Sequence, residues 1–238
     1  MFTKVNSKVV SVDIGRTGPV VARKGAMLFY KGEVLFQPHQ IAGGGMGGGM
    51  PGMGAIGGMA GRMLAGEHES TMIAQGNGEV HYGYRGIEVH IVDLGQVGGT
   101  IRVEASRLLA YGANLQASVV SVASQGGGGG GGGGGLFGAL RSAAAGVVTG
   151  QGMFTTQVSG PGQVVILGHG GVFELEVSPQ KPPVTVDPQA FVGASGQVTT
   201  TLRSTVSWRN VGRTGGEAMQ LECAGQGVVY VQASEEKL

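Results

Sequence analysis

The chain has 238 residues, of which 50 are glycine, 41% are hydrophobic and 13% are charged. Glycine is about three times as frequent as in ordinary proteins and costs about 1 kcal/mol per helical site, so a coiled coil or long-helix protein is excluded. Disorder requires low hydrophobicity and high net charge. With a net charge of +1, the chain is expected to fold around a core and has no basic surplus for binding duplex nucleic acid.

Three features of the sequence bear on the cellular compartment. The single cysteine, Cys223, cannot form an internal disulfide and fits a reducing compartment. The first residues interrupt their apolar positions with Lys4, Lys8 and Asp13, so no secretory signal is expected. The sequence lacks a run of 18 uncharged apolar residues, so it predicts no transmembrane segment. We therefore expect a soluble cytoplasmic protein.

Short strands are predicted along the whole chain, because β-branched and aromatic residues recur in alternating runs. In chain order, five such runs are Lys8–Ile14, Ile87–Leu94, Thr100–Ala105, Val172–Ser178 and Thr200–Trp208. Helix signals are few: residues 59–67 and 136–146 can each form two turns. The sequence predicts an all-β protein, a sandwich or a barrel, with two short helices next to glycine-rich loops.

One segment type, with G-x-G between two alternating runs, recurs three times. The copies are Ser70–Tyr84, Met153–His169 and Met219–Ser234. Alternation around a glycine pair is typical of a β-hairpin, and Asn77-Gly78 suits a type I′ turn. Pro161 departs from that turn chemistry, so the second loop is expected to differ.

A second recurring segment precedes each G-x-G segment, and its copies begin at Gly25, Ser106 and Gln189. Together the two segment types predict three pseudo-repeats, at about 1–97, 98–180 and 181–238, within a single compact domain. Between the two segments, the first repeat carries a glycine-rich loop at 43–61 and the second carries one at 126–135. Glycine-rich chains behave as flexible coils, so both loops are expected to be flexible.

Three stretches, GAMLFYKGEVLF, RMLAGEHESTMIAQGNGEV and GQGMFTTQVSGPGQVVIL, give the chain a resemblance to a known family. Together with the glycine-rich tract, they resemble the family named for altered inheritance of mitochondria, whose fungal members are mitochondrial biogenesis factors. The resemblance covers roughly 20–234. It implies the fold of the tryptophan RNA-binding attenuation protein (TRAP), here as three double-stranded β-helix repeats around a pseudo-threefold axis. The chain resembles a bacterial, cytoplasmic member, since no mitochondrial presequence is recognised.

Motifs for catalysis are weak. The G-x-G segments have His81, Val165 and Tyr230 where a dinucleotide-binding loop needs a third glycine, and a strand is predicted after each. Ser195 lacks the second glycine of G-x-S-x-G, and Cys223 lies in an alternating strand, where a buried structural thiol is expected. The sequence therefore predicts no catalytic and no cofactor-binding residues, and we expect that the protein is not an enzyme.

Histidines and methionines are the remaining candidates for ligand binding. A cupin-like β-barrel that binds a metal or small ligand would use His68, His81 or His90, with His39 and His169 elsewhere in the chain. The usual cupin spacing of histidines and glutamate is absent, so no metal ligand and no cofactor are predicted. Five methionines of the first glycine-rich tract can bind Cu(I) or contact a partner, although a flexible loop is the preferred interpretation: Met46, Met50, Met53, Met59 and Met63.

The leading hypothesis is a non-enzymatic structural or interaction protein that acts through protein–protein contacts, with an unknown partner protein or as a homo-oligomer. The alternative is the cupin-like ligand- or metal-binding barrel. Single-stranded RNA binding, by analogy with the attenuation protein, is a third and disfavoured interpretation, because only 5% of the residues are aromatic and the net charge is low.

Overall fold

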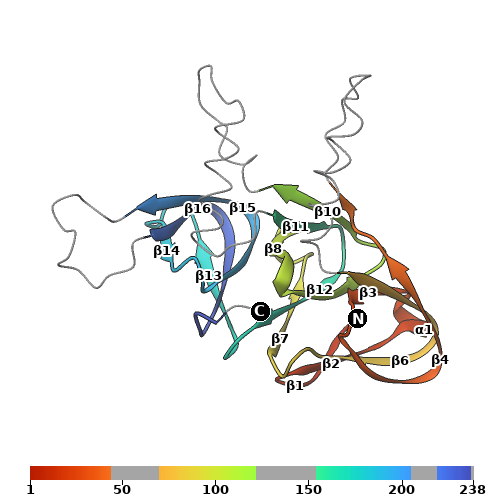
Figure 1. Ribbon diagram of the computed structural model, residues 1–238. Coiled ribbons are helices and arrows are strands. Elements are labelled where there is room, and N and C mark those ends of the chain that lie inside the picture. The colour runs from red at the N-terminus through yellow and green to blue at the C-terminus, as the bar shows by residue number, and fades with distance from the viewer. Residues whose placement is uncertain (44–69, 122–153, 205–218, 237–238) are drawn as a thin grey trace, which may run out of the picture.

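The structure is a computed structural model that describes residues 1–43, 70–121, 154–204 and 219–236. Within these ranges nearly all of the regular secondary structure is strand, and the strands form two eight-stranded sheets (Figure 1). The prediction of an all-β protein is confirmed. The predicted helices at 59–67 and 136–146, the loop at 126–135 and nearly all of the loop at 43–61 lie outside the described residues.

The first sheet is built on β6 (Thr71–Tyr82), which pairs with strands on both of its edges. One edge pairs with β4 along its whole length, and the other pairs with β2 and β3. From one side to the other, the sheet contains β1 (Thr3–Asn6), β2 (Val9–Asp13), β6, β3 (Val20–Arg23), β9 (Leu108–Gly112), β12 (Gln163–Gly168) and β7 (Glu88–Asp93), with β4 (Met27–His39) beside β6.

The second sheet is built on the pair of β15 (Phe191–Ser204) and β16 (Met219–Gln232). In order it contains β13 (Val172–Val177), β16, β15, β8 (Thr100–Glu104), β11 (Phe154–Ser159), β10 (Gln116–Ser121) and β5 (Ala42–Gly43), with β14 (Val184–Val186) beside β16. Within the described residues, every strand pair in the two sheets is antiparallel except that of β5 and β10.

The two recurring segment types pair with each other in three long ladders. In the first, β4 pairs with β6 from Met27↔Tyr82 to His39↔Thr71. In the third, β15 pairs with β16. The middle ladder is divided between the sheets, because β10 pairs with β11 in one sheet and β9 pairs with β12 in the other. Residues 44–69, 122–153 and 205–218, outside the described ranges, separate the two strands of each ladder in the sequence.

The predicted hairpins are wrong, because none of the three G-x-G segments reverses the chain onto itself. β6 and β16 continue through their glycines, while β11 and β12 lie in different sheets. A Cβ atom at Gly76 would lie 2.3 Å from the carbonyl oxygen of Glu33, and one at Gly225 would lie 2.1 Å from that of Gln197. Both glycines also have positive φ, +123° and +118°. These glycines therefore allow close approach to the paired strand rather than a turn.

One short helix, α1 (Ile14–Thr17), was not predicted. It begins where the Asp13 side chain accepts hydrogen bonds from the backbone N–H groups of Gly15 and Arg16, at 3.1 and 3.3 Å. Asp is a preferred N-cap residue because its carboxylate satisfies N–H groups that have no partner within the helix. Among the described residues, no helix has the length and apolar character needed to cross a bilayer.

Buried apolar side chains form three clusters that hold the sheets together. The first lies around β2, β6 and β7 and receives the half-buried side chains of Val34 and Phe36 from β4. The second joins the strands of the middle ladder to β8, and the third lies around β14, β15 and β16. β4 therefore adds only two partly buried side chains to the first cluster, and this places most of the strand at the surface.

Candidate interaction surface

β4 is a long strand at the edge of its sheet. Within the described residues it pairs with β6 alone, so its other edge has no neighbouring strand. Natural edge strands are usually protected by short length, charge, proline or a bulge, because unpaired N–H and C=O groups recruit other strands. β4 has 13 residues, with an irregularity between Met27 and Phe29 and Pro38 near its other end. The stretch between these two features carries two charged residues, Lys31 and Glu33, among apolar ones, and within the described residues its outer edge is unpaired.

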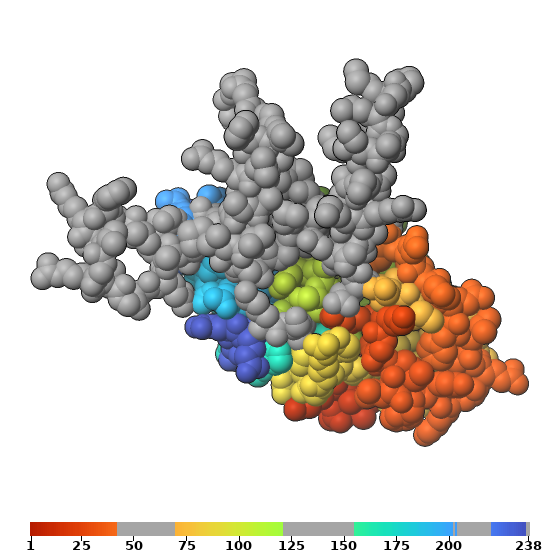
Figure 2. All heavy atoms as spheres, viewed as in Figure 1, coloured from red at the N-terminus to blue at the C-terminus, as the bar shows by residue number. Residues whose placement is uncertain are grey.

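Exposed apolar side chains are concentrated on the same strand. Met27, Leu28, Phe29, Tyr30 and Leu35 are between 39% and 55% exposed, and we call them the β4 surface. The other large exposed apolar residues of the described ranges, Met1, Val5 and Phe173, lie on different segments. In Figure 2, the orange atoms of this part of the chain form one outer side of the molecule. Consecutive side chains of a strand point to opposite faces, so these residues expose apolar surface on both faces of β4. Exposed apolar surface of this extent makes the strand a candidate contact site.

Two side chains of the β4 surface, Phe29 and Tyr30, are held in place by contacts with other rings of the protein. The ring of Phe29 stacks on that of His81, with centroids 4.1 Å apart and an interplanar angle of 17°. The ring of Tyr30 meets that of Phe36 edge-on, with centroids 5.5 Å apart. Because Phe36 packs on the first core cluster, these contacts order the exposed rings before any partner binds.

The histidines proposed for a cupin-like site have separate partners in the structure. Nε2 of His81 lies 3.8 Å from a carboxylate oxygen of Glu79, and its Nδ1 is buried without a hydrogen bond. Nε2 of His90 lies 2.8 Å from a carboxylate oxygen of Glu174. His68 lies outside the described residues. Within the ranges that are described, His, Cys, Asp and Glu side chains form no group of three or more that could hold a metal.

The two candidate nucleophiles are buried. Ser195 has no exposed surface, and its hydroxyl lies 3.3 Å from the hydroxyl of Tyr230. Cys223 belongs to the third core cluster, and burial, followed by the nearby charge of Glu222, raises the pKa of its thiol to about 11. The thiol is therefore protonated and poorly nucleophilic at neutral pH. Burial of Cys223 agrees with the structural role expected from its alternating strand.

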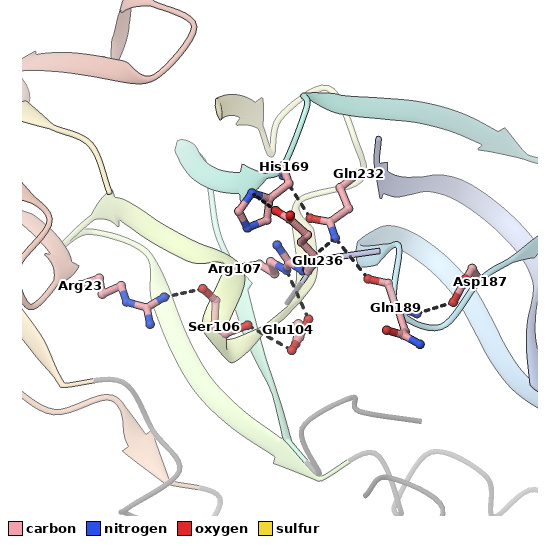
Figure 3. Close-up of polar contacts among 9 residues, drawn as sticks. All are labelled: Arg23, Glu104, Ser106, Arg107, His169, Asp187, Gln189, Gln232 and Glu236. Carbon is pink, nitrogen blue, oxygen red and sulfur yellow. Dashed lines mark hydrogen bonds and ion pairs between the residues drawn. The ribbon is translucent and has the colours of Figure 1, made fainter. Parts of the chain in front are cut away.

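A buried arginine that sequence reasoning missed lies between the second and third ladders (Figure 3). Arg107 ends the short 3-10 helix η1 (Ala105–Arg107), and its side chain is only 1% exposed. Its Nε lies 3.5 Å from a carboxylate oxygen of Glu104, and its Nη2 donates a 2.8 Å hydrogen bond to the Glu236 carbonyl. Among the described residues, Nε and Nη1 have no hydrogen-bond partner, and desolvation lowers the pKa of the guanidinium.

Further hydrogen bonds connect this arginine to distant parts of the chain. The side-chain amide of Gln232 donates to the carbonyls of Glu236 and Gln189, at 2.8 and 3.3 Å. The N–H of His169 donates to the Gln232 side-chain oxygen, and Arg23 donates to the Ser106 carbonyl (Figure 3). The cluster thus joins residues from all three predicted repeats, and this indicates a structural role.

An open hollow of about 630 Å³ lies beside this cluster. It is lined by Asp187, Gln189, Ala190, Ala233, Ser234, Glu235 and Glu236. Among the described residues, the lining contains carboxylates but no histidine, cysteine, lysine or arginine.

Comparisons with known proteins identify the family and the fold. A family model described as "Mitochondrial biogenesis AIM24" matches residues 2–234. A search of curated proteins gave no match. Among solved structures, the chain is similar to an X-ray crystal structure of a protein from Streptococcus pyogenes, with a TM-score of 0.62 and 16% sequence identity. The similarity covers 98% of this chain and 92% of that chain, and at this identity it indicates a shared fold.

Proposed function

The chain belongs to the mitochondrial biogenesis AIM24 family, as its sequence motifs predicted, and we propose that it is a non-enzymatic interaction protein that works through the β4 surface. The observation that carries the proposal is the unpaired edge of β4 together with its five exposed apolar side chains. A strand added to such an edge gains main-chain hydrogen bonds, while the side chains of the edge select the partner.

The surroundings of the candidate catalytic and metal-binding residues support this proposal. Ser195 and Cys223 are buried, so neither side chain faces solvent where a substrate could reach it. His81 lies beneath Phe29 and supports the β4 surface. A cupin-like site would bring together ligands from His68, His81 or His90, whereas His81 and His90 each lie beside a different glutamate, Glu79 and Glu174. The single cysteine is compatible with a reducing compartment, and we keep the cytoplasm as the expected location.

We further propose that the three ladders are TRAP-like repeats of one unit around a pseudo-threefold axis. Matching glycine positions in the first and third ladders support this. Gly32 pairs with Gly78 and Val34 with Gly76 in the first ladder. In the third, Gly196 pairs with Gly227 and Val198 with Gly225.

Replacing Leu28 with lysine tests the contact role. Leu28 is 51% exposed, so the change is expected to leave folding intact, whereas a charged side chain in an apolar contact is costly to desolvate. We expect affinity capture of bound protein from the native host to fall at least about tenfold relative to the native chain. Quantitative mass spectrometry of the captured material measures the change.

The matched control for Leu28→Lys is Val5→Lys on β1. Val5 has a similar exposure, 53%, but lies on a different edge strand. Native-like capture by Val5→Lys together with loss for Leu28→Lys supports the proposal. Equal capture by both variants and by the native chain would overturn it, and thermal unfolding of each variant shows whether the fold is kept.

A further inference from the structure

We propose that the β4 edge pairs with the β4 edge of a second copy of this chain, antiparallel and centred on Gly32, to form a homodimer. The inference rests on the proposed function and names its partner. It follows from three observations: the missing neighbour of β4, the sequence of the strand read from its centre, and the placement of its apolar side chains.

The first observation is that β4 lacks a neighbour that its counterparts have. In the third ladder, β15 pairs with β16 on one edge and with β8 on the other. In the middle ladder, β9 pairs with β12 on one edge and with β3 on the other. Within the described residues, β4 has only β6. β15 and β9 therefore each have a paired strand on both edges, whereas β4 has a paired strand on only one edge within the described residues.

A comparison with the third ladder indicates which residues of β4 would pair with a second neighbouring strand. Gly32 and Gly196 hold matching positions, since each pairs with a glycine of its partner strand. Counting back from these glycines, residues Gly193–Ser195 of β15, which pair with β8, correspond to Phe29–Lys31 of β4. Because the same part of the strand accepts a neighbour in the third ladder, Phe29–Lys31 is where we expect pairing on β4.

The second observation is that the strand is complementary to itself. Lys31 and Glu33 flank Gly32, and apolar residues follow on both sides. In an antiparallel pair centred on Gly32, each Lys31 lies opposite the partner's Glu33, and the two central glycines place no side chains between the strands. Moving outward, the pairs are Tyr30 with Val34, Phe29 with Leu35 and Leu28 with Phe36, each formed twice. Opposite charges and apolar or aromatic pairs in such positions stabilise a ladder.

Charge also selects the antiparallel arrangement. In a parallel pair in register, each Lys31 would lie beside the partner's Lys31, and each Glu33 beside the partner's Glu33. Like charges directly opposite each other destabilise a sheet. The antiparallel pair replaces these repulsions with two attractive contacts and has the twofold symmetry that is commonest among homodimers.

The third observation concerns what could cover the apolar side chains. The other strands with a free edge among the described residues, β1, β5, β7, β13 and β14, have between two and six residues. A strand of that length cannot cover an apolar stretch that extends from Met27 to Leu35. A second β4 brings Leu28, Phe29, Tyr30 and Leu35 of both copies into cross-strand contacts on the two faces of the joined sheet, which favours self-pairing over head-to-tail pairing with one of these shorter strands.

Charge reversal in the full chain tests the pairing, with sedimentation velocity over a range of concentrations as the measurement. In Glu33→Lys, both central contacts become repulsive, and we expect dimerisation to weaken at least about tenfold. Glu33 is opposite Asn77 within its own ladder, so the change introduces no like-charge pair there. The double variant Lys31→Glu, Glu33→Lys restores opposite charges and should dimerise within about threefold of the native chain. Lys31 is opposite Glu79 within its own ladder, so Lys31→Glu adds a like-charge pair there, and thermal unfolding must show that the double variant keeps its fold.

Leu35→Lys is a second disrupting variant, and Val5→Lys is the control that should remain dimeric. A native chain that stays monomeric at every concentration would overturn the proposal. So would folded Glu33→Lys and Leu35→Lys variants that dimerise as tightly as the native chain, or a folded double variant that fails to recover dimerisation. A monomer that still captures a host protein through Leu28 would overturn the self-pairing and leave the proposed function standing.

Discussion

Gly225→Ala is expected to lower the free energy of unfolding by about 4 kcal/mol, because two costs combine. The added Cβ atom would lie 2.1 Å from the Gln197 carbonyl oxygen, a separation at which the backbone of β15 must move. The residue also has φ of +118°, a conformation that side chains other than glycine rarely adopt. Urea unfolding of the native and variant chains measures the difference.

The matched control is Gly171→Ala, which carries only one of these costs. Gly171 has φ of +100°, but a Cβ atom there meets nothing within 4 Å. We expect a loss of about 1 kcal/mol. If the two variants lose the same stability, close approach between β15 and β16 is not the reason for the glycine, and our explanation of the G-x-G segments fails.

Glu104→Gln is expected to cost about 3 kcal/mol of stability, because it leaves the buried Arg107 guanidinium without its anionic partner. The substitution keeps the shape of the side chain, so the loss reports charge rather than packing. Arg107→Met in the native background removes the buried cation as well as its hydrogen bond to the Glu236 carbonyl. The double variant Glu104→Gln, Arg107→Met should recover most of the loss, because no buried charge remains.

An exposed ion pair provides the comparison for Glu104→Gln. Glu222 accepts a 2.8 Å hydrogen bond from Arg203, whose side chain is 63% exposed. We expect Glu222→Gln to change stability by less than about 1 kcal/mol, since exposed pairs contribute little. If Glu104→Gln lowers the free energy of unfolding no more than Glu222→Gln does, then the Arg107 guanidinium is solvated in solution. In that case Arg107 does not connect the ladders.

The sequence was sufficient to predict the all-β class and the family, because alternation and the family motifs are local patterns. The role of the G-x-G segments could not be predicted in the same way. A glycine pair between alternating runs looks the same whether it reverses the chain or allows two strands to approach closely. The positive φ of Gly76 and its nearness to Glu33 depend on a strand that lies far away in the sequence. The α1 helix is different, since Asp13 before Ile14 was a local capping signal that could have been recognised.

The candidate contact surface on β4 depends on which strands, far apart in the sequence, pair with one another. The segment beginning at Gly25 was recognised as a recurring unit, but its sequence does not state that one edge lacks a neighbour. That fact follows from the strand pairing of the folded chain, in which β4 pairs with β6 alone among the described residues. Similarly, Arg107 follows an ordinary strand, and its burial results from packing against the segment around Glu236. His81 drew attention as a ligand candidate, whereas its ring supports Phe29.

Hydrogen–deuterium exchange of the full chain at low and high concentration tests most directly the claim that β4 is the contact surface. Alternate residues of an edge strand direct their N–H groups away from the neighbouring strand, and these groups exchange readily unless a second strand covers them. We predict that protection of Met27–His39 rises with concentration in the native chain and stays low in Glu33→Lys. Exchange of this strand that is independent of concentration, with new protection in another segment, would contradict the account.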